Sequence, residues 1–373
     1  MSTGKKRKRN ARGDVEKVIK KSGRVVILIG EEKDRSAIWV VKLQQQLAQY
    51  LSLSDALQHL SLCVLSVEML KINVVSNNVE NWCYVINRVP ESSRSNIAKT
   101  ATAILQYCTL LNVNVYNSYE CYVIGQNKLL HHGILSALSL RSPPSILIRN
   151  FDAIKNIFDH QLKNDNAAQT SVKLKFPVLL KPNSGGYGRG IFKFQTKNEI
   201  LDFCEKNKDD MEKTLFGNDG TALLQQYYGS VAGSTVYRVW TLNGQIQCGI
   251  KVEKPKGGFG GACLSDTCSR TQTVVEAIDI KSNLSKKLQT DILRIEELCK
   301  ANCCSVEYLF EADDSGNLKS KDPIFFDVNM LSTLPTNLGV QNKIKNANKV
   351  WGEAWNHWKL LAMDIVNNIS KHL

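Results

Sequence analysis

The sequence of 373 residues predicts an α/β fold in which a domain with a mostly parallel sheet precedes an α+β region with antiparallel sheets. Two observations lead to this prediction. Strand-like and helix-like segments alternate over residues 24–162, an order that is typical of parallel strands joined by helices. Beyond that point strand-like segments follow one another through short turns, which predicts antiparallel hairpins.

The N-terminal domain begins with an apolar run, RVVILIG at residues 24–30, which is typical of a buried strand. Apolar residues at helical spacing follow it at 36–51. The same alternation predicts strands at 82–89, 112–118 and 145–150, and helices at 95–111, 120–138 and 151–162. The paired Pro143 and Pro144 cannot continue a helix, so the one over 120–138 ends before them.

The second half of the chain begins with KFPVLLKPNSGGYGRGIFKF at residues 175–194, where two strand-like runs flank a glycine cluster. The segment 235–254 predicts a hairpin, because its Asn243–Gly244 pair suits a type I′ turn. The remaining predicted elements are strands at 221–228, 304–312 and 323–330, a helix at 284–302, and a final amphipathic helix with Trp351, Trp355 and Trp358 at helical spacing.

Composition and cysteine usage are those of an ordinary globular protein, with 43% hydrophobic and 22% charged residues. No apolar run reaches the roughly 18 residues that a membrane helix needs, and the first residues lack the apolar core of a signal peptide. The eleven cysteines, an odd number, favour reduced thiols over a disulfide framework. They form no CxxC pair, and those closest together have no histidine nearby, so zinc is not indicated.

Much of the net charge of +13 lies in residues 1–24, where ten Lys and Arg face only Asp14 and Glu16. We expect this tail to be disordered. Its KKRKR run at 5–9 can be read as a nuclear-import signal, as a nucleic-acid contact, or as a solvated arm. The expected location is therefore cytoplasmic or nuclear, with no membrane partner and with an import receptor or nucleic acid as candidate partners of the tail.

The glycine cluster at 185–190, which we call the glycine loop, is the first candidate for a ligand site. Glycines let backbone N–H groups converge on an anion without interference from Cβ atoms. The loop is no P-loop, because Lys181 precedes the glycines and a strand-like segment follows them. It is compatible with a lid over a polyphosphate, to which Lys181 adds charge, and equally with a long hairpin loop.

Acidic and amide side chains on the last strand pair are the second candidate. Glu307 lies on one predicted strand, and Asp327 and Asn329, two residues apart, face the same side of its neighbour. Carboxylate and amide oxygens are ligands that Mg²⁺ accepts, usually together with substrate phosphates. The alternative is a surface glutamate with a turn or cap formed by Asp327 and Asn329.

Taken in order, these motifs resemble the ATP-grasp superfamily, and within it carboxylate–amine ligases of the RimK-like and glutathione-synthetase types. The resemblance extends from about Trp82 to Pro335. It implies an ATP-grasp fold in which two α+β subdomains with antiparallel sheets clasp ATP. The implied organisation is a basic tail (1–24), an N-terminal α/β domain (25–118), an ATP-grasp domain (119–340) and a C-terminal helix (341–373).

The resemblance also assigns roles to residues of this chain. Arg238 and Lys251, on the hairpin, would be catalytic, and Mg²⁺, or Mn²⁺ in its place, would bind to Glu307, Asp327 and Asn329. The implied ATP-binding residues are Lys128, Lys181, Gly185, Gly186, Gly188, Arg189 and Gly190 at the phosphates, and Gln225, Gln226, Tyr227 and Tyr228 around the adenine. Two departures stand out: Asp327 replaces a commoner glutamate, and residues 256–270 do not resemble a known substrate loop.

The implied activity is Mg-ATP-dependent ligation, in which ATP phosphorylates a carboxylate and an amine attacks the resulting acyl phosphate. The partners would be ATP and a small-molecule or peptide carboxylate of unknown identity. ATP-grasp kinases of inositol polyphosphates also end their metal motif in Asp-x-Asn, so phosphorylation of a hydroxyl group is an alternative. A non-catalytic, synapsin-like nucleotide-binding module is another.

Overall fold

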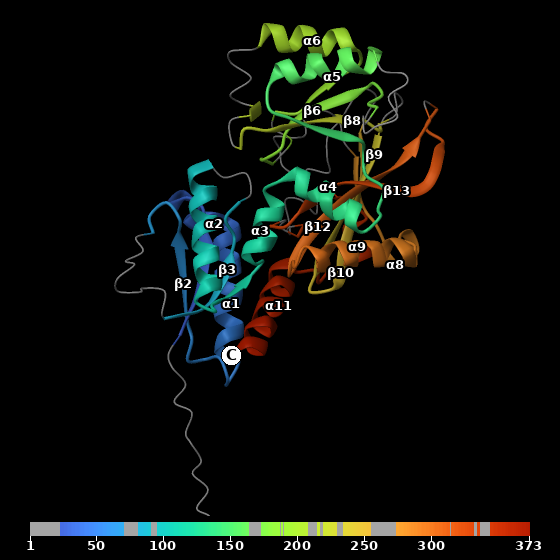
Figure 1. Ribbon diagram of the computed structural model, residues 1–373. Helices are drawn as coiled ribbons and strands as arrows, with labels where there is room; N and C mark the ends of the chain where they lie inside the picture. The colour runs from blue at the N-terminus through green and yellow to red at the C-terminus, as the bar shows by residue number, and fades with distance from the viewer. Residues whose placement is uncertain are drawn as a thin grey trace, which may run out of the picture.

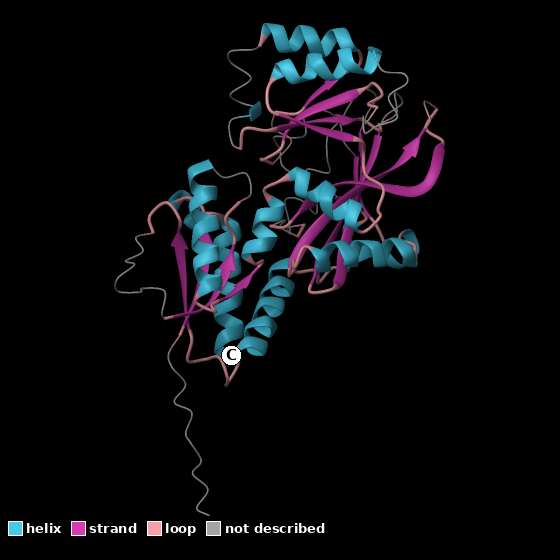
Figure 2. Cartoon of the chain, in the orientation of Figure 1, coloured by secondary structure: helices cyan, strands magenta, loops and turns pink. Residues whose placement is uncertain are grey.

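The computed structural model contains three β-sheets with helices packed against them (Figure 1, Figure 2). It describes residues 23–70, 81–90, 95–163, 173–186, 188, 190–207, 215–216, 219–229, 234–254, 274–313, 315–331, 334–335 and 344–373. Most of the basic tail, Arg189 and the whole of 256–270 therefore lie outside the described residues. Within the described ranges, no helix is both long and apolar enough to cross a membrane.

The N-terminal sheet is parallel throughout, as the sequence predicted, with the strand order β2-β1-β3-β4. Its strands are β1 (Arg24–Ile29), β2 (Ser61–Ser66), β3 (Trp82–Asn87) and β4 (Asn114–Tyr116). The central β1 is buried at five of its six positions, which is why its sequence is an unbroken apolar run. The helices are the short η1 (Glu32–Ser36), α1 (Ile38–Ser52) and α2 (Ser95–Leu110). The sequence analysis missed β2, whose six residues SLCVLS begin and end with serine.

The predicted helix at 120–138 is wrong as a single element, because the structure divides it into α3 (Tyr119–Gly125) and α4 (Lys128–Ala137). Asn127 lies between them with an extended backbone, and its side-chain oxygen accepts a hydrogen bond from the Leu130 N–H, which caps α4. The break makes Lys128 the first residue of a new helix that runs between the other two sheets (Figure 1).

The small sheet has the order β5-β8-β6-β7 and is antiparallel. Its strands are β5 (Ser145–Ile148), β6 (Val178–Pro182), β7 (Phe192–Phe194) and β8 (Ala222–Gln226). The helices α5 (Phe151–Lys163) and α6 (Lys197–Lys206) cover one face (Figure 1) and form a core with Leu180 and Leu224. Since side chains alternate along a strand, Lys181 and Gln225 project from the opposite face, toward α4.

The large sheet has the order β13-β12-β9-β10-β11-β14. Its strands are β9 (Ser234–Leu242), β10 (Gln245–Lys254), β11 (Val274–Ala277), β12 (Cys303–Ala312), β13 (Leu318–Asn329) and β14 (Ile344–Lys345). The predicted β9–β10 hairpin is confirmed, with positive φ at Asn243 and Gly244 as a type I′ turn requires. After the short α8 (Ile280–Asn283), α9 (Lys286–Leu298) packs on one face of this sheet through residues such as Ile292 and Ile295.

The C-terminal segment is not one helix, and the tryptophan pattern misled the prediction. The chain forms α10 (Ala347–Trp351), turns at Gly352 with a φ of 86°, and continues as α11 (His357–His372). Trp355 therefore lies between the helices, although its ring still contacts that of Trp351. The predicted packing on the body of the protein is confirmed, because α11 lies against α1 (Figure 1).

Candidate functional site

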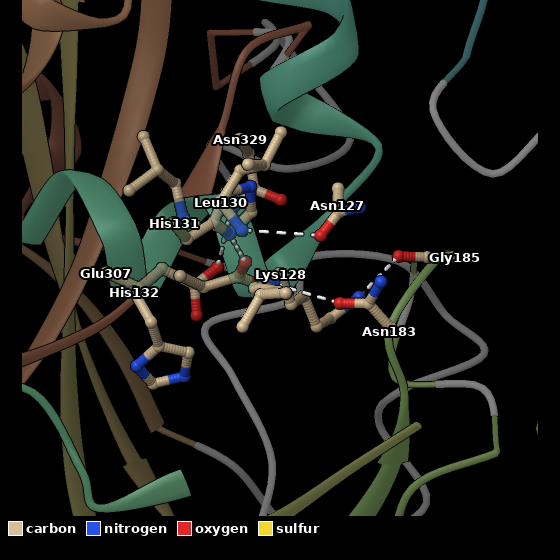
Figure 3. A network of polar contacts seen from close by, with 12 residues as sticks. Asn127, Lys128, Leu130, His131, His132, Asn183, Gly185, Glu307 and Asn329 are labelled. Atoms are coloured by element: carbon tan, nitrogen blue, oxygen red, sulfur yellow. Dashed lines mark hydrogen bonds and ion pairs between the residues drawn. The ribbon is translucent and has the colours of Figure 1, made fainter. Parts of the chain in front are cut away.

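The first turn of α4 meets the end of β6 and the start of the glycine loop (Figure 3). Lys128 Nζ donates a hydrogen bond of 2.8 Å to the carbonyl oxygen of Gly185. The backbone N–H groups of Lys128 and Leu129 donate to the backbone and side-chain oxygens of Asn183 at 3.0 and 2.9 Å. Since these N–H groups are occupied, any positive charge for an anion at this place comes from lysine side chains rather than from the end of the helix.

Asn183 was missed by the sequence analysis, yet it connects three segments of the site. Its side chain is 2% exposed, and its Nδ2 donates to Asp219 Oδ2 at 2.7 Å, while its oxygen atoms hold α4. A polar residue directly after a buried strand and before a glycine cluster was the available signal. This bonding fixes the point from which the glycine loop leaves the sheet.

Lys181 is buried, with 4% of its surface exposed. Burial disfavours the ammonium form and lowers its pKa to about 8; Asp327 and Glu307 act to raise the pKa, and Lys128 acts to lower it. Lys181 therefore lies within electrostatic reach of the other predicted phosphate lysine and of both predicted metal-binding acids. A polyanion bound here would favour its charged form.

The glycine loop has backbone conformations that depend on glycine. The φ angles are 132° at Gly185, 68° at Gly188 and 70° at Gly190, in the region that other residues rarely adopt. A Cβ atom at Gly190 would also lie 3.0 Å from the Pro182 ring. The start of the loop lies beside Lys128, whose Nζ donates to the Gly185 carbonyl oxygen, and Gly186 follows directly.

The structure brings Glu307, Asp327 and Asn329 together on one face of the large sheet. Glu307 lies directly opposite Asp327 in the β12–β13 register, and Asn329 Nδ2 is 3.4 Å from Glu307 Oε1. Glu307 is 3% exposed, whereas the Asp327 side chain keeps 26% of its surface exposed. Figure 3 shows Glu307 and Asn329 beside α4. The three predicted ligands are thus neighbours, as side-chain alternation on paired strands led us to expect.

Arg238 belongs to the same face. Its Nη1 is 3.2 Å from Glu307 Oε1, its Nε donates to Ser305 Oγ at 2.8 Å, and its guanidinium lies over the Trp240 ring. A positive group is therefore held rigidly beside the acids.

Lys251 is not brought to this group. A β-bulge between Ile246 and Cys248 shifts the β9–β10 register, so that Lys251 lies opposite Tyr237 rather than Val236. Lys251 therefore projects from the face opposite to Arg238, where its Nζ contacts Glu253 at 2.8 Å and Glu276 at 3.6 Å. The hydrogen bond to Glu253 raises the pKa of Lys251. A role for Lys251 in catalysis stays a prediction without geometric support.

Two adjacent histidines of α4 complete the site, and the sequence analysis missed both. His131 Nδ1 lies 3.2 Å from Asp327 Oδ1. Burial acts to raise the pKa of Asp327, but the hydrogen bond from His131 and the charges of Lys128 and Lys181 hold it well below its usual range. The available signal was spacing, since His131 and His132 follow Lys128 by three and four residues and share its helix face.

His132 connects α4 to the small sheet. Its Nε2 lies 3.2 Å from Ser145 Oγ and 3.0 Å from Gln225 Nε2. Burial, together with the nearby charge of Lys181, lowers the pKa of His132 to about 4, so the ring is neutral at pH 7 and its Nε2 accepts from the Gln225 amide. The side chain of Gln225 is thereby fixed on the face of the sheet that carries Lys181.

The predicted adenine hinge has part of its backbone already bonded. The N–H groups of Gln226 and Tyr227 donate to the carbonyl oxygens of Pro144 and Pro177, each at 2.9 Å. Among the described residues no partner is found for the Tyr228 N–H, which makes it the first free backbone donor of the hinge. The Tyr228 ring itself lies under the guanidinium of Arg141.

The donor set fits Mg²⁺ better than a transition metal. Across the part of the chain that the structure describes, no three His, Cys, Asp or Glu side chains are grouped as a metal site. Glu307, Asp327 and Asn329 instead offer two carboxylates and one amide, which are hard oxygen ligands. Mg²⁺ typically takes one or two carboxylates and completes its octahedron with water and substrate phosphates.

No family model matches the chain. Two D-alanine–D-alanine ligases of Prochlorococcus marinus strains are 32% and 35% identical to it over 83 residues, which is 22% of this chain and 22% of each relative. The chain thus matches about a fifth of the length of these curated relatives.

Solved structures match nearly the whole chain. A D-alanine–D-alanine ligase from Bacillus anthracis complexed with ATP has a TM-score of 0.58 at 14% identity, covering 94% of this chain and 98% of that one. The ATP-grasp ligase PsnB complexed with a minimal precursor has a TM-score of 0.54 at 12% identity, with coverage of 92% and 97%. A RimK domain ATP-grasp protein from Sphaerobacter thermophilus has a TM-score of 0.55 at 13% identity, with coverage of 92% and 99%.

The protein has the ATP-grasp fold, as the order of its motifs led us to expect. Within that fold, the structures it resembles are ligases of D-alanine, a precursor-binding ligase and a RimK domain protein.

Proposed function

We propose that the protein is a Mg-ATP-dependent carboxylate–amine ligase. One observation carries the proposal: α4 lies between Lys181 of the small sheet and the acids of the large sheet, with its Lys128 bonded to Gly185 and its His131 in contact with Asp327. A cationic half suited to phosphates and an acidic half suited to a divalent cation therefore face one another. Mg·ATP carries both complementary charges.

In this proposal Lys128 and Lys181 hold the α and β phosphates, and the glycine loop covers the triphosphate. Glu307, Asp327 and Asn329 would hold Mg²⁺, or Mn²⁺, which when bound neutralises charge on the β and γ phosphates. Arg238, beside Glu307, would stabilise the negative charge on the phosphoryl group during transfer.

The reaction then has two steps. A substrate carboxylate oxygen attacks the γ-phosphorus of ATP, and the bond to the β–γ bridging oxygen breaks to release ADP and leave an acyl phosphate. An amine next attacks the acyl carbon, loses a proton, and expels inorganic phosphate to leave an amide. The names of the similar structures support this class, since they are ATP-grasp ligases, one of them complexed with ATP and another with a precursor.

One observation favours a second candidate. The chain carries Asp327-x-Asn329, the ending that ATP-grasp inositol polyphosphate kinases also have. Such an enzyme would transfer the phosphoryl group to a hydroxyl and leave a stable phosphate ester. The other alternative is a non-catalytic nucleotide-binding module. Such a module could lose some of the residues suited to phosphates or to a metal ion, whereas this chain has the full set that the resemblance implies.

Interception with hydroxylamine separates the candidates. Incubated with MgATP, hydroxylamine and pools of amino acids, peptides and other carboxylic acids, the protein should form an acyl hydroxamate together with ADP. Asp327→Ala should abolish both products, since it removes a metal ligand. If inositol phosphates yield a phosphorylated product and no acid yields a hydroxamate, the kinase replaces the ligase as the proposed function. If ATP binds but no acceptor leads to release of ADP, the binding module is favoured.

A further inference from the structure

The contact between His131 and Asp327 joins a helix to the predicted metal-binding strand. His131 lies on α4, 2% exposed, and Asp327 lies near the end of β13. Their Nδ1 and Oδ1 atoms are 3.2 Å apart, which is within hydrogen-bonding range for a charged acceptor. The contact is therefore directional and largely shielded from water.

The two contacts of His131 Nδ1 require opposite roles: the Asp327 oxygen at 3.2 Å needs a donor, whereas the longer Val328 N–H contact at 3.4 Å needs an acceptor. A lone pair on Nδ1 would face the negative Asp327 oxygen and repel it, so Nδ1 carries the hydrogen and donates it. Nε2 is buried and has no hydrogen-bond partner among the described residues, so the tautomer with only a lone pair there avoids a buried, unpaired donor. His131 is in this respect unlike His132, whose Nε2 accepts from Gln225.

A hydrogen bond to one oxygen of Asp327 determines where the other oxygen points. The terminal torsion of aspartate is broad and has no sharp preference of its own. With Oδ1 held by α4, rotation of the carboxylate is restricted and Oδ2 is left available as a metal ligand. Glu307 lies directly opposite Asp327, and Arg238 holds one Glu307 oxygen in the same manner. Each acid thus has one oxygen held by a protein donor.

We propose that His131 is a positioning residue that orients the Asp327 carboxylate for a divalent cation bound with the nucleotide. The inference rests on the proposed Mg-ATP function. Some hydrogen-bond donors hold a metal-binding carboxylate without touching the metal themselves. Removing such a donor typically lowers metal affinity or activity by 10- to 100-fold.

A purely structural role is the rival explanation. His131 Nδ1 also lies 3.4 Å from the Val328 N–H, a contact that would tie α4 to β13 with Nδ1 as acceptor. A structural anchor would affect folding and nucleotide binding in general. A positioning residue affects the contribution of the metal and leaves metal-free nucleotide binding unchanged.

Three substitutions separate these roles. In His131→Asn the amide Nδ2 can occupy the place of Nδ1 and restore the donor. In His131→Gln, the matched control, the amide nitrogen lies near the place of Nε2, away from Asp327, and His131→Leu has no donor. The full-length variants are titrated with ADP in the absence and presence of Mn²⁺ by calorimetry, and the affinity of each ADP complex for Mn²⁺ is measured by EPR.

We expect His131→Gln and His131→Leu to weaken Mn²⁺ binding to the ADP complex by about 10- to 100-fold, and His131→Asn to stay within about threefold of wild type. ADP affinity without metal should be unchanged in all three. Should His131→Leu fail to fold, the Asn and Gln variants still decide. Equal Mn²⁺ affinities for Asn and Gln, or a matching loss of metal-free ADP affinity, would overturn the positioning role. If Mn²⁺ does not affect ADP binding to wild type, the metal site of the proposed function fails as well.

Discussion

Replacing Lys181 by methionine should stabilise the free protein while weakening nucleotide binding. Methionine nearly preserves the volume of the buried side chain but cannot carry a charge. Burial lowers the pKa of Lys181 from 10.5 to about 8. At about 1.4 kcal/mol per pKa unit, keeping this ammonium charged in the folded state costs about 3 kcal/mol at pH 7. The free energy of unfolding of Lys181→Met should exceed that of wild type by up to this amount.

The sign of the pH dependence follows from proton binding. Below pH 8 both the folded and the unfolded wild type keep the Lys181 proton, so the whole penalty is present. Between pH 8 and 10.5 the unfolded chain binds more protons than the folded one. The free energy of unfolding of wild type therefore rises with pH relative to that of the variant. Urea unfolding at pH 7 and at pH 10 measures the difference, which should be large at the lower pH and small at the higher one.

MgATP affinity should change in the opposite direction. Loss of one hydrogen bond to a charged group weakens binding by roughly 1.5 to 3 kcal/mol, or about 10- to 150-fold. Calorimetry with MgATP on the folded variant measures it. An unchanged affinity would mean that Lys181 does not face the phosphates, and a variant less stable than wild type at pH 7 would refute the burial argument.

Two further predictions concern the glycine loop and the two hairpin cations. Gly190→Ala and Gly188→Ala should each cost about 1–2 kcal/mol of loop strain, because φ is positive at both positions. Only the new Cβ atom of Gly190→Ala also meets the Pro182 ring, so this variant should lose more MgATP affinity in calorimetry. Equal losses would argue against that contact. Arg238→Ala should lower the rate of ADP release by about 100-fold or more. Lys251 lies on the other face of the sheet, so Lys251→Ala should stay close to wild type in the same assay. A loss as large as that of Arg238→Ala would show that Lys251 takes part in the reaction.

Strand patterning gave a reliable account of the acids. The two-residue spacing of Asp327 and Asn329 places both side chains on one face whatever the exact register, and Glu307 lies on the neighbouring strand. These positions depend on local alternation, which a single sequence contains.

Features that depend on single irregularities were not predictable in this way. In a regular hairpin closed by Asn243–Gly244, Lys251 would pair with Val236 and share the face of Arg238. The bulge before Cys248 moves Lys251 to the opposite face of the sheet, and no residue type at the bulge indicates its presence.

The histidines were missed for a different reason. The segment 120–138 was treated as one helix, although Gly125 and Asn127 are the residues that end one helix and cap the next. Recognising the break would have made Lys128 the start of α4, with His131 one turn away on the same face.

The last helix joins the N-terminal sheet to the large sheet. On α11, Asn368 accepts from Tyr84 and Asp364 accepts from Tyr116, both of the N-terminal sheet, while Asp364 also accepts from Asn243 in the β9–β10 turn. These bonds hold the N-terminal domain and the large sheet as one frame. Arg238 and the three predicted oxygen ligands are fixed in that frame, whereas Lys181 and the glycine loop belong to the small sheet. The proposed nucleotide site therefore lies between two parts that are built separately and joined at α4, through the contacts of Lys128 with Gly185, Leu129 with Asn183, and His132 with Gln225.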